Sequence, residues 1–202
     1  MITMQQNMRW YGPHDGIRLC DIRQCGGTGV VTALHQISVG EVWSVEDIQK
    51  RQRMIVEEGM EWTVVESLPV HEDIKRQGGD YQQYISNYKK SLENLAESGL
   101  KVVAYNFMPI LDWVRTDHAY ANPDGTKALL FDEIAFIFFD VFLLKRPGAE
   151  SDYSKDKVEE ASEYGKTLSQ DQKDELFKNV LLGLPGSDES FTPEKILELL
   201  DA

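Results

Sequence analysis

Cysteine, basic residues and long apolar runs are all scarce in this sequence, and each shortage excludes a class of protein. The 202 residues include two cysteines, Cys20 and Cys25, whose spacing fits neither a zinc ribbon nor a C-x-x-C redox motif. We interpret them as reduced thiols in a reducing compartment. The most apolar run, residues 134–144, is interrupted by Asp140 and is shorter than the roughly 20 residues that span a bilayer. The first residues are polar and do not resemble a signal peptide. We therefore expect a cytoplasmic protein with no membrane partner.

The shortage of positive charge argues against nucleic acid as a partner. The chain has 21 Lys and Arg residues against 34 Asp and Glu residues, and its net charge is −13. A protein that binds nucleic acid needs a basic face to displace counterions, and no cluster of Lys and Arg here is large enough. Residues 150–202 are the most acidic part, with 14 acidic and 6 basic side chains, as is typical of solvated helix surface.

A repeated pattern predicts the fold class. Three times, a segment with helical periodicity ends at glycine and a nearly continuous apolar run follows, at residues 30–34, 62–66 and 102–106. An earlier strand is predicted at residues 8–11. Strands that are apolar throughout are typical of a parallel sheet with both faces buried. The pattern predicts an α/β fold with about four βα units, either a small open sheet or half of a (β/α)₈ barrel, which needs eight strands.

Helix signals divide the chain into two parts. Ser44, Asp80 and Asp132 are predicted N-caps, and further helices are expected to start near Ser154, Ser169 and Thr192. We expect residues 81–95 and 131–144 to be helical, residues 183–186 to form a loop, and no strand to follow residues 106–109. Residues 1–125 are therefore assigned to a half barrel and residues 126–202 to a helical insertion or extension, with the chain ending before the remaining barrel strands.

The candidate functional residues follow the predicted strands, because the carboxyl ends of parallel strands form the rim where sites develop. P-loop, G-x-S-x-G and H-E-x-x-H motifs are absent. His71 follows a proline at a strand end and is a candidate for proton transfer, although its segment also fits a solvated loop. Arg115 suits a bidentate clamp on a carboxylate or an ion pair with its neighbour Asp112. The other rim residues are Tyr11, His35, Glu66 and Asn106, of which His35 also suits a turn cap and Glu66 also suits backbone donors.

Four ordered blocks carry a resemblance to a known family. Arg9-Trp10-Tyr11-Gly12 and Gly29-Val30-Val31-Thr32-Ala33-Leu34 resemble the first two strands of mannonate dehydratases. The segments at residues 65–75 and 105–116 resemble the third and fourth strand blocks, and residues 144–150 and 183–186 resemble an insertion of one branch. The similarity covers nearly the whole chain and about half of the family's length.

The resemblance implies a function and a cofactor. Mannonate dehydratases are metal-dependent (β/α)₈ barrels that convert D-mannonate to 2-dehydro-3-deoxy-D-gluconate in hexuronate breakdown, with Fe²⁺ or Mn²⁺ held by Cys, His and Asp ligands on later strands. The His-Pro-Asp-Asp and Arg-Pro-Asp-His-Gly runs that carry such ligands are absent here, so no residue of this chain is assigned to the metal. The implied partner is a small sugar acid, in an enzyme that is a homo-oligomer at full length. We expect the chain alone to self-associate and to lack dehydratase activity.

Two other interpretations remain open. A metal-dependent barrel of the sugar-isomerase type would share the strand-end carboxylates and histidines, but it lacks the block matches. A non-catalytic remnant or assembly module would use the apolar helix at residues 131–144 to pack against a partner.

Overall fold

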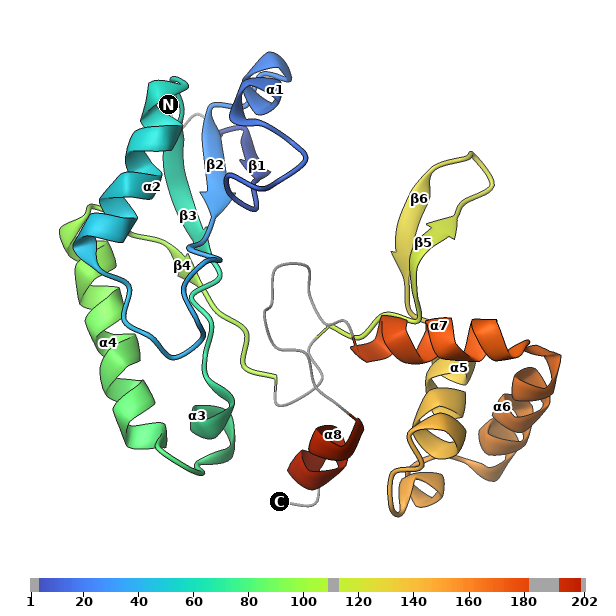
Figure 1. Ribbon diagram of the computed structural model, residues 1–202. Coiled ribbons are helices and arrows are strands. Elements are labelled where there is room, and N and C mark those ends of the chain that lie inside the picture. The colour runs from blue at the N-terminus through green and yellow to red at the C-terminus, as the bar shows by residue number, and fades with distance from the viewer. Residues whose placement is uncertain (1–3, 109–112, 182–192, 201–202) are drawn as a thin grey trace. The chain divides into compact units, whose positions relative to one another are not determined.

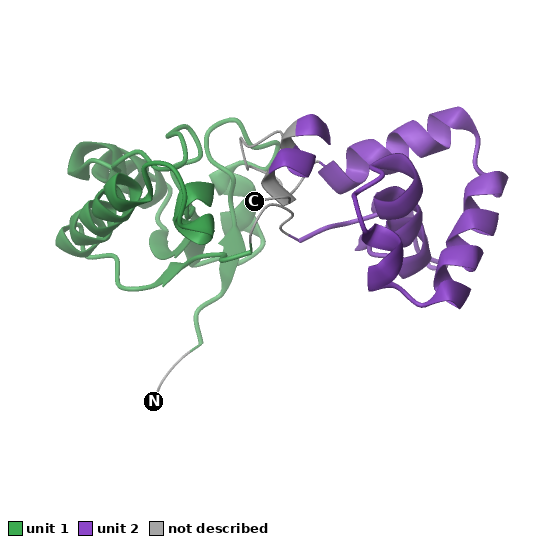
Figure 2. Ribbon diagram, turned by 90° about the horizontal axis from the view of Figure 1, so that it is seen from below, with its two compact units in different colours: residues 1–109 green, residues 110–202 purple. Residues whose placement is uncertain are grey.

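The computed structural model describes residues 4–108, 113–181 and 193–200, and the chain forms two compact units (Figure 2). Unit 1 comprises Met1–Pro109 and unit 2 comprises Ile110–Ala202. This division lies earlier in the chain than residue 125, where the sequence suggested a change. The assignment of residues 1–125 to a half barrel and 126–202 to an insertion stays a prediction.

Unit 1 is built on a parallel sheet of four strands in the order β1-β2-β3-β4 (Figure 1). The strands are β1 (Asn7–Arg9), β2 (Gly29–Thr32), β3 (Glu61–Glu66) and β4 (Val103–Ala104), and each pairs in parallel with the next along the chain. Sequential parallel pairing requires a crossover between every two strands, which the intervening helices supply. The predicted α/β fold with a parallel sheet is confirmed.

Helices cover one face of this sheet. The helices of unit 1 are α1 (Leu19–Gln24), α2 (Val45–Glu57), α3 (Glu72–Arg76) and α4 (Tyr81–Glu97). Figure 1 shows α2 and α4 side by side along the sheet. Val30 and Val65 of the sheet are fully buried in one core cluster with Ile48 and Ile55 of α2 and Leu95 of α4. Burying such side chains stabilises the fold by about 1.5–3 kcal/mol each.

Side-chain capping follows the prediction at Ser44 but not at Asp80. Ser44 Oγ accepts a hydrogen bond from the Asp47 amide at 3.1 Å, as predicted for an N-cap. Asp80 stands at the N-cap position of α4, but its side chain makes no capping hydrogen bond. Farther along α4, Ser91 Oγ accepts from the Trp43 amide at 3.0 Å and Asn94 Nδ2 donates to the Trp43 carbonyl at 2.7 Å. Through these two side chains, α4 holds the loop that precedes α2.

Unit 2 contains a hairpin that the sequence analysis did not expect. Strands β5 (Asp117–Ala121) and β6 (Lys127–Leu130) pair antiparallel, so the expectation of no strand after residue 109 was wrong. The turn carries the residues Asp124 and Gly125, a strong hairpin signal. The flanking strands were overlooked because they do not alternate between apolar and polar residues, and most of their side chains are exposed.

The rest of unit 2 is helical, as predicted. Its elements are α5 (Glu133–Phe138), the π-helix η1 (Phe139–Leu143), the 3₁₀ helix η2 (Ala149–Asp152), α6 (Lys155–Thr167), α7 (Gln170–Leu181) and α8 (Pro193–Leu200). Asp132 Oδ1 accepts from the Ala135 amide at 2.8 Å and caps α5. Residue 192 and the predicted loop at 183–186 lie outside the described residues. In the described part of the chain, no helix is both long and apolar enough to cross a membrane.

Candidate functional site

Three strands of unit 1 deliver a connected row of polar side chains to the carboxyl end of the sheet. Arg9, the last residue of β1, forms an ion pair with Glu66, the last residue of β3, with 3.0 Å between Nη1 and Oε1. The Arg9 guanidinium carbon lies 4.9 Å from the centre of the Tyr11 ring. That ring lies 5.7 Å from the ring of His35, which follows β2. We call Arg9, Tyr11, His35 and Glu66 the strand-end row.

The strand-end row is open to a ligand. The side chains of Arg9 and Glu66 are 30% and 50% exposed, and Tyr11 is 39% exposed. Arg9 contacts Glu66 through Nη1, and because a guanidinium has several N–H donors, it can also donate to an anion. The Nε atom of Arg9 is buried and has no hydrogen-bond partner among the described residues. A cation, a carboxylate, a phenol and an imidazole side by side suit a small polyhydroxy acid, whose carboxylate and hydroxyl groups need both donors and acceptors.

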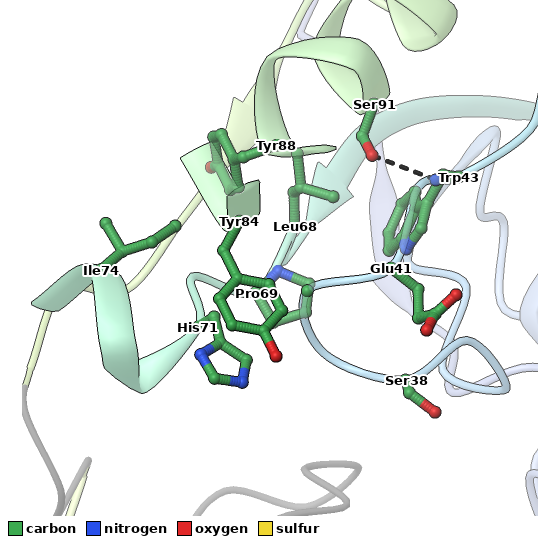
Figure 3. Close-up of a pocket in the computed structure, with 11 residues that line it drawn as sticks. Ser38, Glu41, Trp43, Leu68, Pro69, His71, Ile74, Tyr84, Tyr88 and Ser91 are labelled. Atoms are coloured by element: carbon green, nitrogen blue, oxygen red, sulfur yellow. Dashed lines mark hydrogen bonds between the residues drawn. The ribbon is translucent and has the colours of Figure 1, made fainter. Parts of the chain in front are cut away.

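His71 occupies a separate recess of unit 1. It is the N-cap of α3, and its Nδ1 accepts a hydrogen bond from the Asp73 amide at 3.1 Å. Its ring stacks on Tyr84 of α4 with 3.6 Å between centroids (Figure 3). Gly40 approaches this stack so closely that a Cβ there would lie 2.6 Å from the Tyr84 ring. Other residues that line the recess include Ser38, Glu41, Trp43, Leu68 and Pro69.

This geometry determines which nitrogen of His71 can transfer a proton. Since Nδ1 accepts the capping hydrogen bond, the neutral ring carries its proton on Nε2. Nε2 is therefore the atom available to donate or exchange a proton with a ligand. Protonating Nδ1 instead would remove the acceptor and cost α3 its cap.

The structure brings together some of the predicted rim residues. Tyr11, His35 and Glu66 share the strand-end row, while His71 lies in its own recess, whose lining does not include them. Asn106 is half-buried just after β4.

Two predicted residues lie elsewhere. Arg115 belongs to unit 2, where its Nη1 donates to the carbonyls of Trp113 at 3.1 Å and Val114 at 2.7 Å. Asp112 lies outside the described residues, so its pairing with Arg115 stays a prediction.

Sequence reasoning missed two arginines beside these residues. Arg9 lies between Met8 and Trp10 in the strand predicted at residues 8–11, and a charged residue at that place was the available signal. Arg51 is 4% exposed and shares the buried face of α2 with Ile48 and Ile55. Arg51 lies three residues after Ile48 and four before Ile55. This spacing was the available signal, because it directs a side chain into the core.

The described residues do not fit a metal ion. Nowhere among them do three His, Cys, Asp or Glu side chains gather closely enough to hold one. Cys20, in α1, is half-buried, and Cys25, at the end of that helix, is exposed; both are free thiols. No chemical step is therefore assigned to a metal on these side chains.

Comparison with known proteins adds a family to this geometry. The family model described as D-mannonate dehydratase (UxuA) matches residues 4–202. The chain is 54% identical over 198 residues to the mannonate dehydratase of Marinomonas sp. (strain MWYL1) and 47% identical over 197 residues to that of Chromohalobacter salexigens. Both matches cover 98% of this chain but only about half of each relative, 51% of the Marinomonas protein and 50% of the Chromohalobacter protein.

A solved structure agrees with these matches. The crystal structure of mannonate dehydratase from Streptococcus suis serotype 2 superposes with a TM-score of 0.62 at 32% identity, covering 94% of this chain and 52% of that one. The family match over residues 4–202 and the structural match over 94% of the chain agree with each other. They show that this chain belongs to the mannonate dehydratase family and corresponds to about half of its relatives' length.

Proposed function

We propose that this chain forms one wall of a mannonate dehydratase active site, in a (β/α)₈ barrel of which β1 to β4 are the first four strands. The reaction removes water from D-mannonate to give 2-dehydro-3-deoxy-D-gluconate. The observation that carries the proposal is the strand-end row, because it presents complementary charges at the end of a parallel sheet where ligands bind. The chain's membership of the family supplies the substrate class.

The strand-end row and its neighbours bind and orient the sugar acid. Tyr11, His35 and Glu66 exchange hydrogen bonds with its hydroxyl groups, and Asn106 extends this surface at the end of β4. From the sequence pattern alone, Asp112 and Arg115 are also proposed to bind the substrate, Arg115 through the substrate carboxylate. Holding the hydroxyls in one orientation brings the reacting carbon and its proton into a fixed place.

His71 transfers a proton. Dehydration takes the proton from the carbon next to the carboxylate and expels the neighbouring hydroxyl, which leaves as water once it is protonated. The Nε2 atom is suited to this exchange, because Nδ1 is engaged by the Asp73 amide and the ring is held against Tyr84. The stack fixes the direction of the ring, as a general acid or base requires.

The family's Fe²⁺ or Mn²⁺ would stabilise the charge that develops on the substrate carboxylate. Since the described residues do not fit an ion, the part of the reaction that we assign to this chain is substrate binding, substrate orientation and proton transfer. Without the ion the largest stabilising contribution is missing, and the chain alone is inactive. We place the reaction in the cytoplasm.

The proposal is tested by histidine NMR on the chain itself. The four histidines are His14, His35, His71 and His118, so ¹³C-labelled histidine gives four assignable signals. D-Mannonate is expected to shift the signals of His35 and His71. His118, whose Nε2 lies 3.0 Å from the Asn179 carbonyl, belongs to unit 2 together with Arg115, so its signal reports separately on binding there.

The same titration separates the alternatives. Shifts on adding an aldose but not mannonate would favour a sugar-isomerase reaction. No response to either sugar, with the apolar helix α5 protected in a complex, would favour an assembly module. Metal analysis of the purified chain accompanies both measurements, and a complete ion cage drawn from this chain would contradict the proposed division of the site.

A further inference from the structure

Arg51 is a buried cation whose hydrogen bonds go to neutral oxygen atoms. Its residue is 4% exposed, and it sits in α2 on the face that packs against the sheet. Nη1 donates to the Ala33 carbonyl at 2.8 Å and to Thr32 Oγ1 at 3.3 Å, and Nη2 donates to Gln36 Oε1 at 3.0 Å. Burial lowers the pKa of this guanidinium. None of the described carboxylates forms an ion pair with Arg51. A buried charge without such a partner is costly, so its presence calls for a reason beyond packing.

The three acceptors belong to the segment that carries His35. Thr32 ends β2, Ala33 follows it, and Gln36 lies directly after His35. A planar guanidinium holds acceptors on two of its nitrogens at fixed angles, so it defines the path of the chain between Ala33 and Gln36. His35 lies inside that clamped segment.

The same guanidinium also contacts the segment that carries Tyr11. Its carbon lies 5.1 Å from the centre of the Trp10 ring. On the other side of Tyr11, Gly12 has φ +100°, and a Cβ there would lie 3.0 Å from Arg51 Nη1. Glycine therefore satisfies two demands at once, the left-handed backbone and the close approach of the guanidinium.

We infer that Arg51 is a positioning residue, which holds the segments after β1 and β2 together so that the Tyr11 and His35 rings stay in contact. The inference rests on the proposed function in that these rings belong to the proposed mannonate site. Arg51 reaches this place because a crossover helix runs antiparallel to the strands, which puts the first turns of α2 near their carboxyl ends.

The test compares Arg51→Met, Arg51→Lys and a matched control in the full chain. Methionine keeps the length and apolar packing but removes every donor, and lysine keeps the charge but loses the two-nitrogen fork. Arg53→Met removes an exposed arginine from the same helix. The readout is the nuclear Overhauser contact between the Tyr11 and His35 rings, which are 5.7 Å apart between centroids. The contact is expected to be lost in both Arg51 variants and retained in Arg53→Met.

The ring contact in the Arg51 variants decides the inference if those variants fold. A folded Arg51→Met or Arg51→Lys chain that retains the ring contact overturns it. If both variants unfold, Gln36→Ala decides, because Gln36 is exposed and the substitution removes only the Nη2 hydrogen bond. Added mobility of the His35 ring in that variant supports the inference, and an unchanged ring contradicts it.

A mannonate titration of the same variants separates this inference from the proposed function. If mannonate shifts His35 in the unmodified chain, the shift is expected to disappear in Arg51→Lys while that in Arg53→Met remains. If mannonate shifts no histidine in the unmodified chain, the proposed function fails, but the ring contact still decides the role of Arg51.

Discussion

Two aspartates that share one arginine allow the effect of burial in unit 2 to be measured. Arg146 donates from Nε and Nη2 to Asp140, at 2.9 Å to Oδ1 and 2.6 Å to Oδ2, and its Nη2 lies 2.8 Å from Asp152 Oδ2. The Asp140 side chain is 6% exposed and that of Asp152 is 56% exposed. The hydroxyl of Tyr153 also donates to Asp140 at 2.8 Å. The two carboxylates therefore differ mainly in burial and in hydrogen bonding.

Asp140→Asn is expected to destabilise unit 2 far more than Asp152→Asn does. Removing one partner of a buried ion pair costs about 3–5 kcal/mol. Because Arg146 keeps Asp152 and its side chain is 22% exposed, we expect the lower end of that range, about 3 kcal/mol. For the exposed partner Asp152 the expected loss is about 0–1 kcal/mol.

Hydrogen exchange read by mass spectrometry measures this difference in unit 2 alone. A loss of about 3 kcal/mol accelerates exchange of the α5 and α6 amides by roughly 100-fold, since each 1.4 kcal/mol is a factor of ten. Peptides from α2 and α4 report on unit 1 and should not change. Equal acceleration by both substitutions would refute the argument that burial sets the contribution of each pair.

Three further predictions concern packing, pH and association. Gly165→Ala places a Cβ inside the contact radius of the Phe138 ring, so the free energy of unfolding of unit 2 should fall by about 1–3 kcal/mol in thermal or denaturant unfolding, whereas Gly78→Ala, with nothing within 4 Å, should not lower stability. Burial and the hydrogen bond to Asp140 raise the pKa of Tyr153 to about 12. The neutral phenol therefore stabilises the fold below the unfolded pKa of about 10, and this stabilisation is lost as the pH rises towards 12; Tyr153→Phe should remove that part of the alkaline unfolding profile. Sedimentation equilibrium of the chain alone should show self-association, because β1 and β4 are the outer strands of their sheet, and a monodisperse monomer would contradict this.

Signals confined to neighbouring residues made much of the fold predictable. The parallel strands follow from apolar runs after glycine, and the caps at Ser44 and Asp132 from single polar residues before amphipathic segments. The helix predicted at residues 81–95 is present as α4, but its buried face is not purely apolar: Leu95 is buried and Leu92 is exposed, while Ser91 and Asn94 are buried and bind Trp43. Polar residues with buried partners are not recognised by a search for apolar periodicity.

The candidate site was less predictable, because its contacts join residues far apart in the sequence. Strand-end position identified Tyr11, His35 and Glu66, but nothing local indicates that Arg9 crosses the sheet to reach Glu66. His71 is the N-cap of α3, yet its segment also fits a solvated loop in the sequence, because the five residues of this helix are too few for a periodic pattern. Contacts of this kind depend on strand register and helix direction, which a single sequence does not specify.

Reconstitution with the rest of the enzyme tests the central claim most directly. The chain would be co-expressed with the carboxyl-terminal half of the Marinomonas relative, which is 54% identical over the shared part, and assayed with D-mannonate in the presence of Mn²⁺ or Fe²⁺. We predict that the two halves associate and release 2-dehydro-3-deoxy-D-gluconate, that neither half does so alone, and that His71→Ala in this chain abolishes the product. Turnover by the chain alone, or a reconstituted enzyme indifferent to the loss of His71, Tyr11 and Glu66 together, would contradict the claim that these strands form one wall of the site.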